Sequence, residues 1–533
     1  MNFLRLNDYL LTILFENEDI IAVDKPYGIN SHTNDSKIGN FDFIQDGLIE
    51  TFERQLSRKL YIVHRLDQTT TGVIIFAKSP ESAKKYADYF FEKEVKKTYW
   101  FVTASHSAAD QFMIDQIIVH KAKDLEAQTK FKVIKKSSKF ELWQANPLTG
   151  RNHQIRIHAQ AAGIPLLGDE KYEGAVYPFL CLHNHRIEFP NGLVITSEVP
   201  KYFEDLTLLE NQILAKALFE TDRRERLFAK VEDNQCFRLV HNKNDFKDLG
   251  FTIDQFGKYL ILSSYTEDWT ESDQKTFFYY ANYMQKPIYV RLMHNRGKDA
   301  ANKSQFTILP TKSEAQTLDT VWVANEKETK YEMRSDSGQS FGLFLDQRLQ
   351  RSWIRENTKD KLVLNLFSYT CGFSVAAALG GAKEVTSVDT NKNVLNWGRK
   401  NFELNAIDTQ KHKFLCRDSI TFLEQCRSKN IKYDLIICDP PSFSRGEKGV
   451  FKIENNLETL LTTCLSCLTD EGDLLFSTNF ENFFVDDIRK AILKVQSELK
   501  IKNLVIDCIH SALDFELAGK RAILKSFLIR KKL

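Results

Sequence analysis

The sequence predicts a multidomain protein that combines α/β and α+β domains and ends in a doubly wound parallel sheet. Two observations carry this prediction. Short apolar strands alternate with helical segments over roughly the last two hundred residues, which is typical of consecutive βαβ units. The chain also has 533 residues, whereas single hydrophobic cores stop growing well below that length, so about three or four domains are expected.

The first strong local pattern is segment 64–72, His-Arg-Leu-Asp-Gln-Thr-Thr-Thr-Gly, which precedes the apolar run 73–76. This order predicts a polar loop that enters a buried strand. A carboxylate at such a rim, here Asp67 close to Arg65, can stay ionised while shielded from bulk water, as a nucleophilic aspartate requires. The alternative is an aspartate that only caps a turn, a common place for this residue type.

Further motifs surround this loop in the chain: a Lys-Pro-Tyr-Gly turn at 25–28 after an apolar strand, then segments 97–99, 149–158, 163–169 and 182–183. Together with His-Arg-Leu-Asp they resemble the RluA-type pseudouridine synthases over residues 10–200. The resemblance implies a mixed-sheet catalytic domain that acts on uridine in RNA without a cofactor.

The same resemblance implies a role for individual residues. Asp67 is expected to be the nucleophile or base, and Arg156 its ion-pair partner. Tyr99 is expected to lie against the target base and Leu182 to line the pocket, while Arg65 fills the space that a flipped base leaves. Without the resemblance, a core tyrosine and a surface arginine are the simpler interpretations. Asn152 replaces the threonine usual in its motif, which leaves the catalytic set intact.

The expected domains are 1–205, a helical connector at 206–235, a small α/β central domain at 236–328, and a final domain at 329–533. The central domain is predicted from short strands at 238–240, 251–254, 259–262 and 287–291, with a helix at 275–284.

In the final domain, a buried strand at 362–367 runs into the turn 368–374 and a helix at 375–379. Gly372 at that helix start lets a ligand approach backbone amides. A second strand ends at Asp389, where a ribose diol can donate hydrogen bonds, and a third leads to Asp418 and Ser419. The fourth, at 434–438, ends in Asp439-Pro440-Pro441-Ser442-Phe443, which presents a polar group and rigid carbonyls at the crevice.

These features resemble class I S-adenosylmethionine-dependent methyltransferases, whose fold is Rossmann-like. The strings 342–348 and 365–370 narrow the resemblance to the RlmI/RlmK-like rRNA methyltransferases over residues 236–533, without that family's usual amino-terminal RNA-binding module. The resemblance implies S-adenosylmethionine as the cofactor and Asp439, Pro440 and Pro441 as catalytic residues. It implies cofactor contacts from Phe344, Asp346, Arg348, Asn365, Phe367, Ser368, Tyr369, Gly372, Asp389, Asp418, Ser419 and Asp439.

The methylated atom is predicted from chemistry. Methylation of cytosine carbon 5 normally needs a cysteine thiolate, and neither 442–443 nor the Phe-Ser-Thr-Asn string 476–479 supplies one. Cys438 is expected to point into the sheet. Guanine N7 has an exposed lone pair and needs only alignment, and the string 476–479 also resembles the RlmK branch, the guanine-N7 methyltransferases of large-subunit rRNA, so N7 is our prediction. The alternatives are 5-methylcytosine or N2-methylguanine.

Composition limits the partners. With 73 Lys and Arg against 71 Asp and Glu, the net charge is +2, so RNA contacts have to come from local basic surface. Candidates are Lys93, Lys96 and Lys97 and the segments 223–226 and 296–303, although charge runs are often simply solvated. The expected substrate is large-subunit (23S) rRNA, with tRNA as an alternative for the first half. A non-catalytic RNA-binding assembly factor is the alternative of another class.

No apolar stretch of about 18 residues and no secretion signal occurs, so a soluble cytoplasmic protein without an obligate protein partner is expected. Nine scattered cysteines agree with a reducing compartment, and no metal site is predicted. Cys464 and Cys467 form a Cys-x-x-Cys pair within apolar positions at helical spacing, so we interpret them as helix core.

Overall fold

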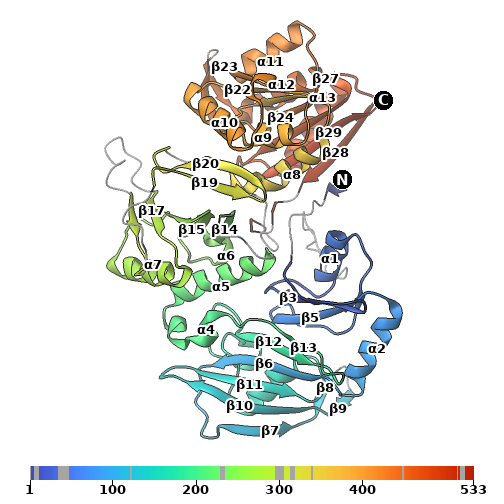
Figure 1. Ribbon diagram of the computed structural model, residues 1–533, viewed down its shortest axis with the longest axis vertical. Coiled ribbons are helices and arrows are strands. Elements are labelled where there is room, and N and C mark those ends of the chain that lie inside the picture. The colour runs from blue at the N-terminus through green and yellow to red at the C-terminus, as the bar shows by residue number, and fades with distance from the viewer. Residues whose placement is uncertain are drawn as a thin grey trace.

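The computed structural model describes residues 2–4, 11–33, 47–120, 123–228, 234–293, 305–311, 319–337, 340–446, 449–509, 511–512, 514–515 and 523–532. In this part of the chain, three sheets with their helices follow one another along the long axis of the molecule (Figure 1). No helix among these residues is long and apolar enough to cross a membrane.

The N-terminal unit is built on a ten-stranded mixed sheet. Strands β3 and β5 are buried along their whole length, because their apolar runs are covered on both faces. The strands are β2 (Ile13–Glu16), β3 (Ile20–Lys25), β4 (Tyr61–Ile62), β5 (Thr71–Ala77), β6 (Lys96–Thr103), β7 (Gln111–Asp115), β10 (Gln128–Lys136), β11 (Glu141–Pro147), β12 (Leu182–Glu188) and β13 (Val194–Thr196).

Helices and a small hairpin complete this unit. The helices are α1 (Leu48–Leu56), α2 (Pro80–Phe91), α3 (Gln154–Ala161) and α4 (Lys201–Glu204), with the short η2 (Glu170–Tyr172) and η3 (Leu206–Glu210). Strands β8 (Ile118–His120) and β9 (Lys123–Leu125) form a separate hairpin.

The central unit is a five-stranded sheet in the order β14 (Cys236–His241), β15 (Phe251–Phe256), β16 (Tyr259–Ser264), β17 (Ile288–Leu292) and β18 (Gln305–Ile308). It carries α6 (Asn242–Asp245) and α7 (Glu271–Met284). Helix α7 begins two residues after Trp269 with a capping box, in which Thr270 and Asp273 each satisfy the other's backbone N–H. Strands β19 (Val321–Glu326) and β20 (Thr329–Arg334) form a hairpin, so the division expected at 328 falls inside a hairpin.

The C-terminal unit is an eight-stranded sheet in the order β1-β28-β29-β27-β24-β21-β22-β23. Strands β21, β22, β23, β24 and β27 are parallel, as the alternating pattern predicted, while β29 runs antiparallel to its neighbours. The strands are β21 (Leu362–Leu366), β22 (Glu384–Asp389), β23 (Lys413–Cys416), β24 (Tyr433–Cys438), β27 (Leu468–Thr478), β28 (Asn503–Ile509) and β29 (Lys525–Lys532).

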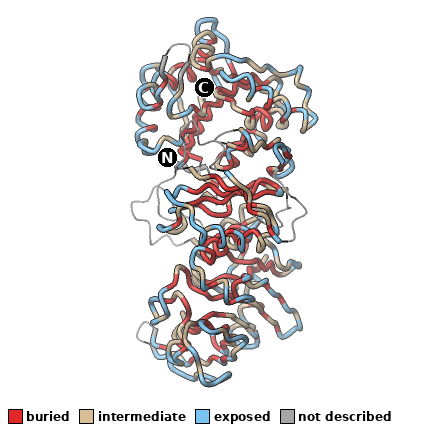
Figure 2. Tube along the Cα trace, turned by 90° about the vertical axis from the view of Figure 1, so that its left-hand side faces the viewer, coloured by how far each residue is buried: buried red, intermediate tan, exposed pale blue. Residues whose placement is uncertain are grey.

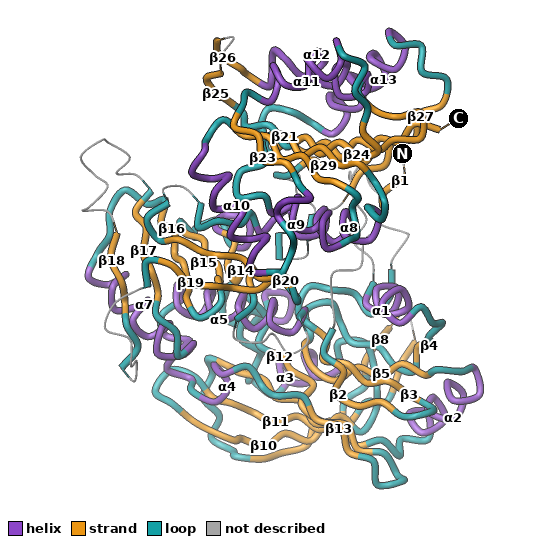
Figure 3. The backbone as a smooth tube through the Cα atoms, turned by 45° about the horizontal axis from the view of Figure 1, so that its top comes forward, coloured by secondary structure: helices purple, strands orange, loops and turns teal. Residues whose placement is uncertain are grey.

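Helices cover both faces of this sheet. Figure 3 shows α11 (Ser419–Ser428), α12 (Ile453–Ser466) and α13 (Val485–Glu498) on one face. Helices α8 (Arg348–Asn357), α9 (Gly372–Leu379) and α10 (Lys392–Leu404) lie on the other, next to the central unit (Figure 3). Short helices η4 (Leu345–Gln347) and η5 (Thr409–Lys411) and a hairpin of β25 (Phe443–Gly446) and β26 (Gly449–Lys452) complete the unit.

The first strand of the chain does not belong to the N-terminal sheet. Strand β1 (Asn2–Leu4) pairs in parallel with β28 at the edge of the C-terminal sheet. Figure 1 places the N-terminus beside β28 accordingly. Residues 2–4 therefore lie apart from the rest of the expected domain 1–205, and the chain passes between the two end units at its very start.

Helix α5 (Gln212–Leu227) occupies the middle of the molecule (Figure 1). Its residues Leu214, Ala217 and Leu218 pack in one hydrophobic cluster with the central sheet. Ala215 and Phe219 pack in another with the N-terminal unit. The expected connector is thus a structural layer shared by two units, and Figure 2 shows buried chain continuing through this level of the molecule.

The charged end of α5 is buried. Arg224 is 0% and Arg226 is 7% exposed, because both side chains form ion pairs inside the protein. The prediction that segment 223–226 is a surface RNA contact is therefore wrong for these two arginines. Of the other basic segments, 296–303 lies outside the described residues, while Lys93 and Lys96 are exposed.

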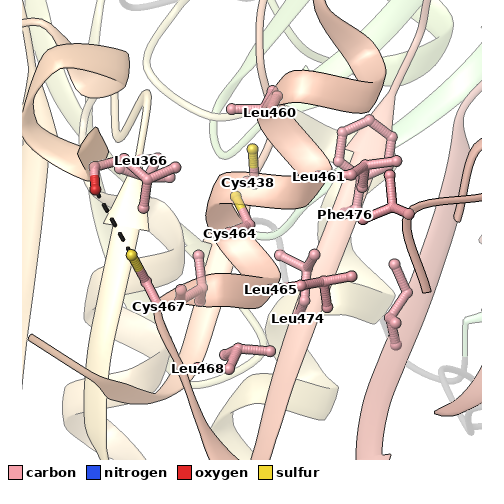
Figure 4. Packing of buried hydrophobic residues seen from close by; sticks show 14 of the residues in the cluster. Leu366, Cys438, Leu460, Leu461, Cys464, Leu465, Cys467, Leu468, Leu474 and Phe476 are labelled. Atoms are coloured by element: carbon pink, nitrogen blue, oxygen red, sulfur yellow. Dashed lines mark hydrogen bonds between the residues drawn. The ribbon is translucent and has the colours of Figure 1, made fainter. Parts of the chain in front are cut away.

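The Cys-x-x-Cys pair lies in the core of the C-terminal unit, as predicted. Cys464 and Cys467 are both 0% exposed and pack with leucines of α12 and with Cys438 (Figure 4). The Cys467 thiol lies 3.6 Å from the carbonyl oxygen of Leu423, which accepts its weak hydrogen bond. Among the described residues, no group of three or more His, Cys, Asp or Glu side chains could hold a metal ion.

Candidate active sites

The loop that carries Asp67 connects β4 to β5 and is held in place by the side chain of Lys25. The buried Lys25 Nζ donates to the carbonyl oxygens of Pro26, Gln68 and Thr70 at 3.1, 3.0 and 2.8 Å. Burial lowers the pKa of Lys25 to about 7, and the charge of Asp67 opposes that shift. Two of these bonds fix the backbone that follows Asp67, and the third fixes the turn after β3.

Gly72 sets how closely this loop approaches β12. It has a φ of +103°, and a Cβ there would lie 2.3 Å from the carbonyl oxygen of Asn184. Only glycine therefore allows β5 to begin so close to β12. Since Leu182 is the first residue of β12, this contact places Leu182 beside the Asp67 loop.

The structure brings an arginine and a histidine to Asp67. Arg156 Nη1 lies 3.9 Å and His153 Nε2 3.7 Å from Asp67 Oδ2. The two hydrogen bonds of Arg156, however, go to Asp169, at 2.6 and 2.7 Å from its Nε and Nη2. The buried Asp169 thus holds Arg156 in place, and Arg156 reaches Asp67 only at long range. The sequence had implied a simple ion pair between Arg156 and Asp67.

Tyr99 and Arg65 complete this site. Tyr99 is half-buried in β6, and burial together with the Asp67 charge raises its pKa, so the phenol stays neutral. Arg65 is exposed at the rim. Asp67, Tyr99, Arg156, Arg65 and Leu182 all line one cavity of about 1100 Å³.

Three further residues of this cavity had no catalytic role in the sequence prediction. His153 adopts a left-handed conformation, with a φ of 55° at the start of α3, which turns its ring toward Asp67. Lys97 donates to the carbonyl oxygen of Thr149 at 3.0 Å, and burial lowers its pKa to about 8. Lys93 also lines the cavity, so two of the three lysines predicted to contact RNA surround it. His153 and Lys97 stand in the motifs that carry the family resemblance, but no local pattern shows which way their side chains point.

The second site lies at the carboxyl ends of the parallel strands in the C-terminal unit. After β21 the backbone makes an unusual turn, since Phe367, Tyr369 and Cys371 all have positive φ, at 54°, 45° and 63°. Positive φ in three non-glycine residues is costly and is found mainly at functional sites. The turn leads directly to Gly372, the first residue of α9, so backbone N–H groups at the helix start face the cavity.

Asp389 ends β22 and braces this turn. Its Oδ2 accepts from the backbone N–H of Tyr369 and its Oδ1 from that of Asn391, both at 2.9 Å. A carboxylate has about four acceptor sites, so Asp389 can still accept from a ribose diol. Asp418 caps α11 by accepting from the Thr421 N–H at 2.8 Å, and the next residue, Ser419, accepts from the Phe367 N–H at 3.0 Å.

Asp439 lies at the end of β24 among other polar groups. Gln347 Nε2 donates to Asp439 Oδ2 at 3.0 Å. Burial, with the like charge of Asp346 adding to it, raises the pKa of Asp439 to about 8. Arg351, which pairs with Glu326 at 2.6 Å, acts in the opposite direction. Asp439 is therefore mainly protonated at neutral pH.

Most of the residues assigned to the cofactor share one cavity of about 480 Å³. These are Phe344, Asp346, Phe367, Ser368, Tyr369, Gly372, Asp389, Asp418, Ser419 and Asp439, with Pro440 and Pro441. Gln347, Arg351, Thr370 and Asn479 also line it and had no assigned role. Gln347 stands in the quoted string 342–348, but only the fold brings it to Asp439.

Two of the assigned residues do not line this cavity. Arg348 points away from the cavity and pairs with the buried Asp514, at 3.1 and 2.6 Å from its two terminal nitrogens. Asn365 is fully buried within β21, where it donates to the Ser374 hydroxyl at 2.8 Å. In both cases the partner lies outside the motif, so the motif alone did not show the direction of the side chain.

A smaller cavity of about 220 Å³ adjoins the second site. It lies between the central sheet, which contributes Arg238, Asp254 and Arg291, and the C-terminal unit. The two cavities share lining residues at their junction: Leu343, Phe344, Asp346 and Leu524.

Comparison with known proteins agrees with this division. A family model of S-adenosylmethionine-dependent methyltransferases matches residues 311–495, and one of RNA pseudouridylate synthases matches residues 19–161. The ribosomal RNA large subunit methyltransferase K of Neisseria meningitidis serogroup B is 30% identical over 263 residues, which are 49% of this chain and 74% of that protein. The chain belongs to the family of this methyltransferase K.

Longer members of the methyltransferase K family are covered less completely. The ribosomal RNA large subunit methyltransferase K/L of Psychrobacter cryohalolentis is 37% identical over 195 residues, 36% of this chain but 24% of that protein. The chain thus spans about a quarter of the length of that relative.

A solved structure supports the fold of the central and C-terminal units. A putative methyltransferase complexed with SAH has 24% identity and a TM-score of 0.53, over 70% of this chain and 98% of that one. The protein therefore combines an RNA pseudouridylate synthase domain with an S-adenosylmethionine-dependent methyltransferase domain, as the sequence predicted. The second cavity fits the cofactor of that domain, because it joins a carboxylate at a strand end to free amides at a helix start.

Proposed function

We propose that the protein is a bifunctional RNA-modifying enzyme, which isomerises uridine to pseudouridine in one half and methylates guanine N7 of large-subunit (23S) rRNA in the other. The observation that carries this proposal is the presence of two separate cavities, each lined by the residues that the matching family leads us to expect. A protein that only binds RNA has no need for an aspartate beside an arginine and a histidine and a second, protonated aspartate in a cofactor cavity.

In the N-terminal half, Asp67 acts as nucleophile or base on the uridine. The N1–C1′ bond breaks, a C5–C1′ bond forms and the C5 proton is released. Arg156 and His153 lie beside the Asp67 carboxyl group, and the neutral ring of Tyr99 offers a face for the extracted base. The exposed Arg65 occupies the space that this base leaves in its helix.

In the C-terminal half, Asp389 accepts hydrogen bonds from the ribose of S-adenosylmethionine, which supplies a methyl group on a sulfonium centre. Ser368, Tyr369, Gly372, Asp418 and Ser419 enclose the rest of the cofactor in this proposal. Asp439, Pro440 and Pro441 face the base. Their part is to align the base for direct attack on the methyl carbon.

The assignment to N7 is supported by the absence of a usable thiol. Among the described residues, none that lines the cavity is a cysteine. Cys438 is fully buried, and burial holds the pKa of its thiol well above the ordinary value, so a thiolate is not available. Methylation at cytosine carbon 5 is therefore disfavoured, whereas guanine N7 needs no covalent help.

The test uses modified substrates with the full chain. RNA that contains 5-fluorocytidine should not become trapped on the enzyme, because no thiolate attacks the ring. Borohydride reduction followed by aniline should cut the product at one guanosine, since 7-methylguanosine is cationic. A 7-deazaguanosine at that position should abolish transfer. A trapped adduct, or full methylation of the deaza substrate, would rule out N7. Full methylation of the deaza substrate is the result expected if the enzyme methylates guanine N2.

The choice of large-subunit rRNA rests on the named relatives and on economy, since fusion is most useful when both targets mature on one RNA. Mapping pseudouridines and methylated bases in RNA from cells with and without the protein tests it. Two sites lost together from 23S rRNA would support the proposal. Loss of a tRNA pseudouridine would mean that the N-terminal half acts on tRNA. If no modified site is lost, the result would favour a non-catalytic assembly factor.

A further inference from the structure

Phe344 and Asp346 lie at the junction of the two neighbouring cavities in the C-terminal half. Phe344 is 49% exposed, which is unusual for a phenylalanine within a site. An exposed aromatic ring between a cofactor cavity and a second cavity can stack on a planar base. Asp346, two residues further on, also lines both cavities.

Asp346 and Asp439 line one cavity, and the charge of Asp346 affects the ionisation of Asp439. The like charge of Asp346 acts with burial to keep Asp439 protonated, and Arg351 opposes this without reversing it. Burial raises the pKa of Asp346 as well, and Arg238 and Arg351 oppose that shift because they favour its ionised form. Cys438, adjacent to Asp439, is neutral because burial raises its pKa. The site therefore offers one hydrogen-bond acceptor and one donor next to each other.

The hydrogen bond from Gln347 fixes which oxygen of Asp439 donates. Gln347 Nε2 donates to Oδ2, so this oxygen acts as an acceptor. The proton of the neutral carboxyl then resides on Oδ1. Gln347 is 3% exposed and comes from η4, so it holds the carboxyl in one orientation.

We propose that Asp346 and Asp439 recognise the O6/N1–H edge of guanine, with Phe344 against the ring. Asp346 accepts from N1–H and the 2-amino group, while Asp439 Oδ1–H donates to O6. Adenine and cytosine present the reverse order of donor and acceptor, so the same pair rejects them. N7 adjoins O6 and stays free to face the methyl group. This inference rests on the proposed guanine methylation and assigns Phe344 and Asp346 to the base instead of the cofactor.

The experiment measures RNA binding by the full chain without S-adenosylmethionine, using fluorescence anisotropy. After the methylated guanosine has been mapped, short RNAs carry guanosine or 2-aminopurine there; 2-aminopurine lacks O6 and has an acceptor at N1. Wild type should bind the guanosine RNA about 10- to 100-fold more tightly at about pH 6.5. This preference should largely disappear at about pH 9, where Asp439 is ionised.

Three variants separate recognition from general damage. Asp439→Asn keeps a neutral donor, so its preference for guanosine should survive at both pH values. Asp439→Ala and Asp346→Ala should bind the two RNAs alike. Glu471→Gln, which changes an exposed carboxylate on β27, should match wild type.

The inference is overturned if Asp439→Ala keeps the preference, or if the preference of wild type grows as the pH rises. The latter outcome would mean that an ionised Asp439 accepts from an amino group. Failure of the proposed function gives a different result, because mapping would then find no 7-methylguanosine.

Discussion

Arg224 and Asp514 are 290 residues apart in the sequence, yet Arg224 Nε lies 3.1 Å from the carbonyl oxygen of Asp514. The Asp514 carboxylate accepts from both terminal nitrogens of Arg348 and from the backbone N–H of Arg238, at 2.6 to 3.1 Å. Asp514 and Arg224 are both 0% exposed. One buried aspartate thus ties the C-terminal unit to the central sheet and to α5, and α5 in turn packs on the N-terminal unit.

Replacing Arg226 should destabilise this junction strongly. Arg226 pairs with Asp24 of β3 and with Asp222, and donates to the carbonyl oxygen of Glu198 at 2.9 Å. Arg226→Met leaves two carboxylates without their buried cation. We expect the free energy of unfolding to fall by about 3 to 5 kcal/mol in the first transition of a urea titration followed by tryptophan fluorescence.

Arg186→Met is the matched control for this change. Its partner Glu188 is on the same strand and both side chains are partly exposed, so the loss should stay within about 1 kcal/mol. Equal effects of the two substitutions would mean that the α5 junction contributes no more than a surface ion pair.

Asp67→Asn should abolish pseudouridine formation and leave methyl transfer intact. An amide can serve neither as nucleophile nor as base, and the methyltransferase cavity is lined by a separate set of residues. Tritium release from RNA labelled at uridine C5 measures the first activity, and methyl incorporation from labelled S-adenosylmethionine measures the second. Asp88→Asn, on the exposed side of α2, should retain both. Substantial tritium release by the Asp67 variant would remove Asp67 from the mechanism.

The sequence predicted the strands, helices and site loops that depend on local patterns. The ends of β21, β22, β23 and β24 follow from apolar runs that stop at polar turns, so Asp389 and Asp439 were placed correctly at the strand ends. Side-chain directions could not be predicted where the partner is distant. Arg348 pairs with Asp514, 166 residues further on, which no feature of its own motif indicates.

The burial of charged side chains could not be predicted from the sequence either. The run Arg223-Arg224-Glu225-Arg226 has the same composition whether it faces water or the core. The position of its partners decides this: the fold brings the carboxylates of Asp24 and Asp245 and the carbonyl oxygen of Asp514 from three different parts of the chain. Strand β1 is a similar case, since three residues contain no periodicity that could assign them to a remote sheet.

Asp389→Ala should weaken binding of S-adenosylmethionine to the full chain by about 1 to 3 kcal/mol, the scale of charge-assisted hydrogen bonds to a ribose. Titration calorimetry gives the value directly. Asp389 also braces the N–H groups of Tyr369 and Asn391, so some of the loss comes from a looser turn. Glu403→Ala, at an exposed ion pair on α10, should leave the affinity unchanged. Wild-type affinity in the Asp389 variant would contradict the ribose assignment.

Asp439→Asn should stabilise the protein, and the gain should grow with pH. The folded-state pKa of Asp439 is about 8, whereas an unfolded aspartate has its ordinary value of 3.8. Between these values the folded state binds more protons than the unfolded state, so the contribution of Asp439 to stability declines as the pH rises. An asparagine does not titrate and escapes this decline. We expect a gain of about 1 to 3 kcal/mol near pH 8, less than the whole shift implies because solvent reaches the group.

The Tm of the variant should therefore exceed that of wild type by more at pH 8 than at pH 5. A Tm difference that is constant over this range, or that narrows toward pH 8, would show that Asp439 is already ionised in the folded protein at neutral pH.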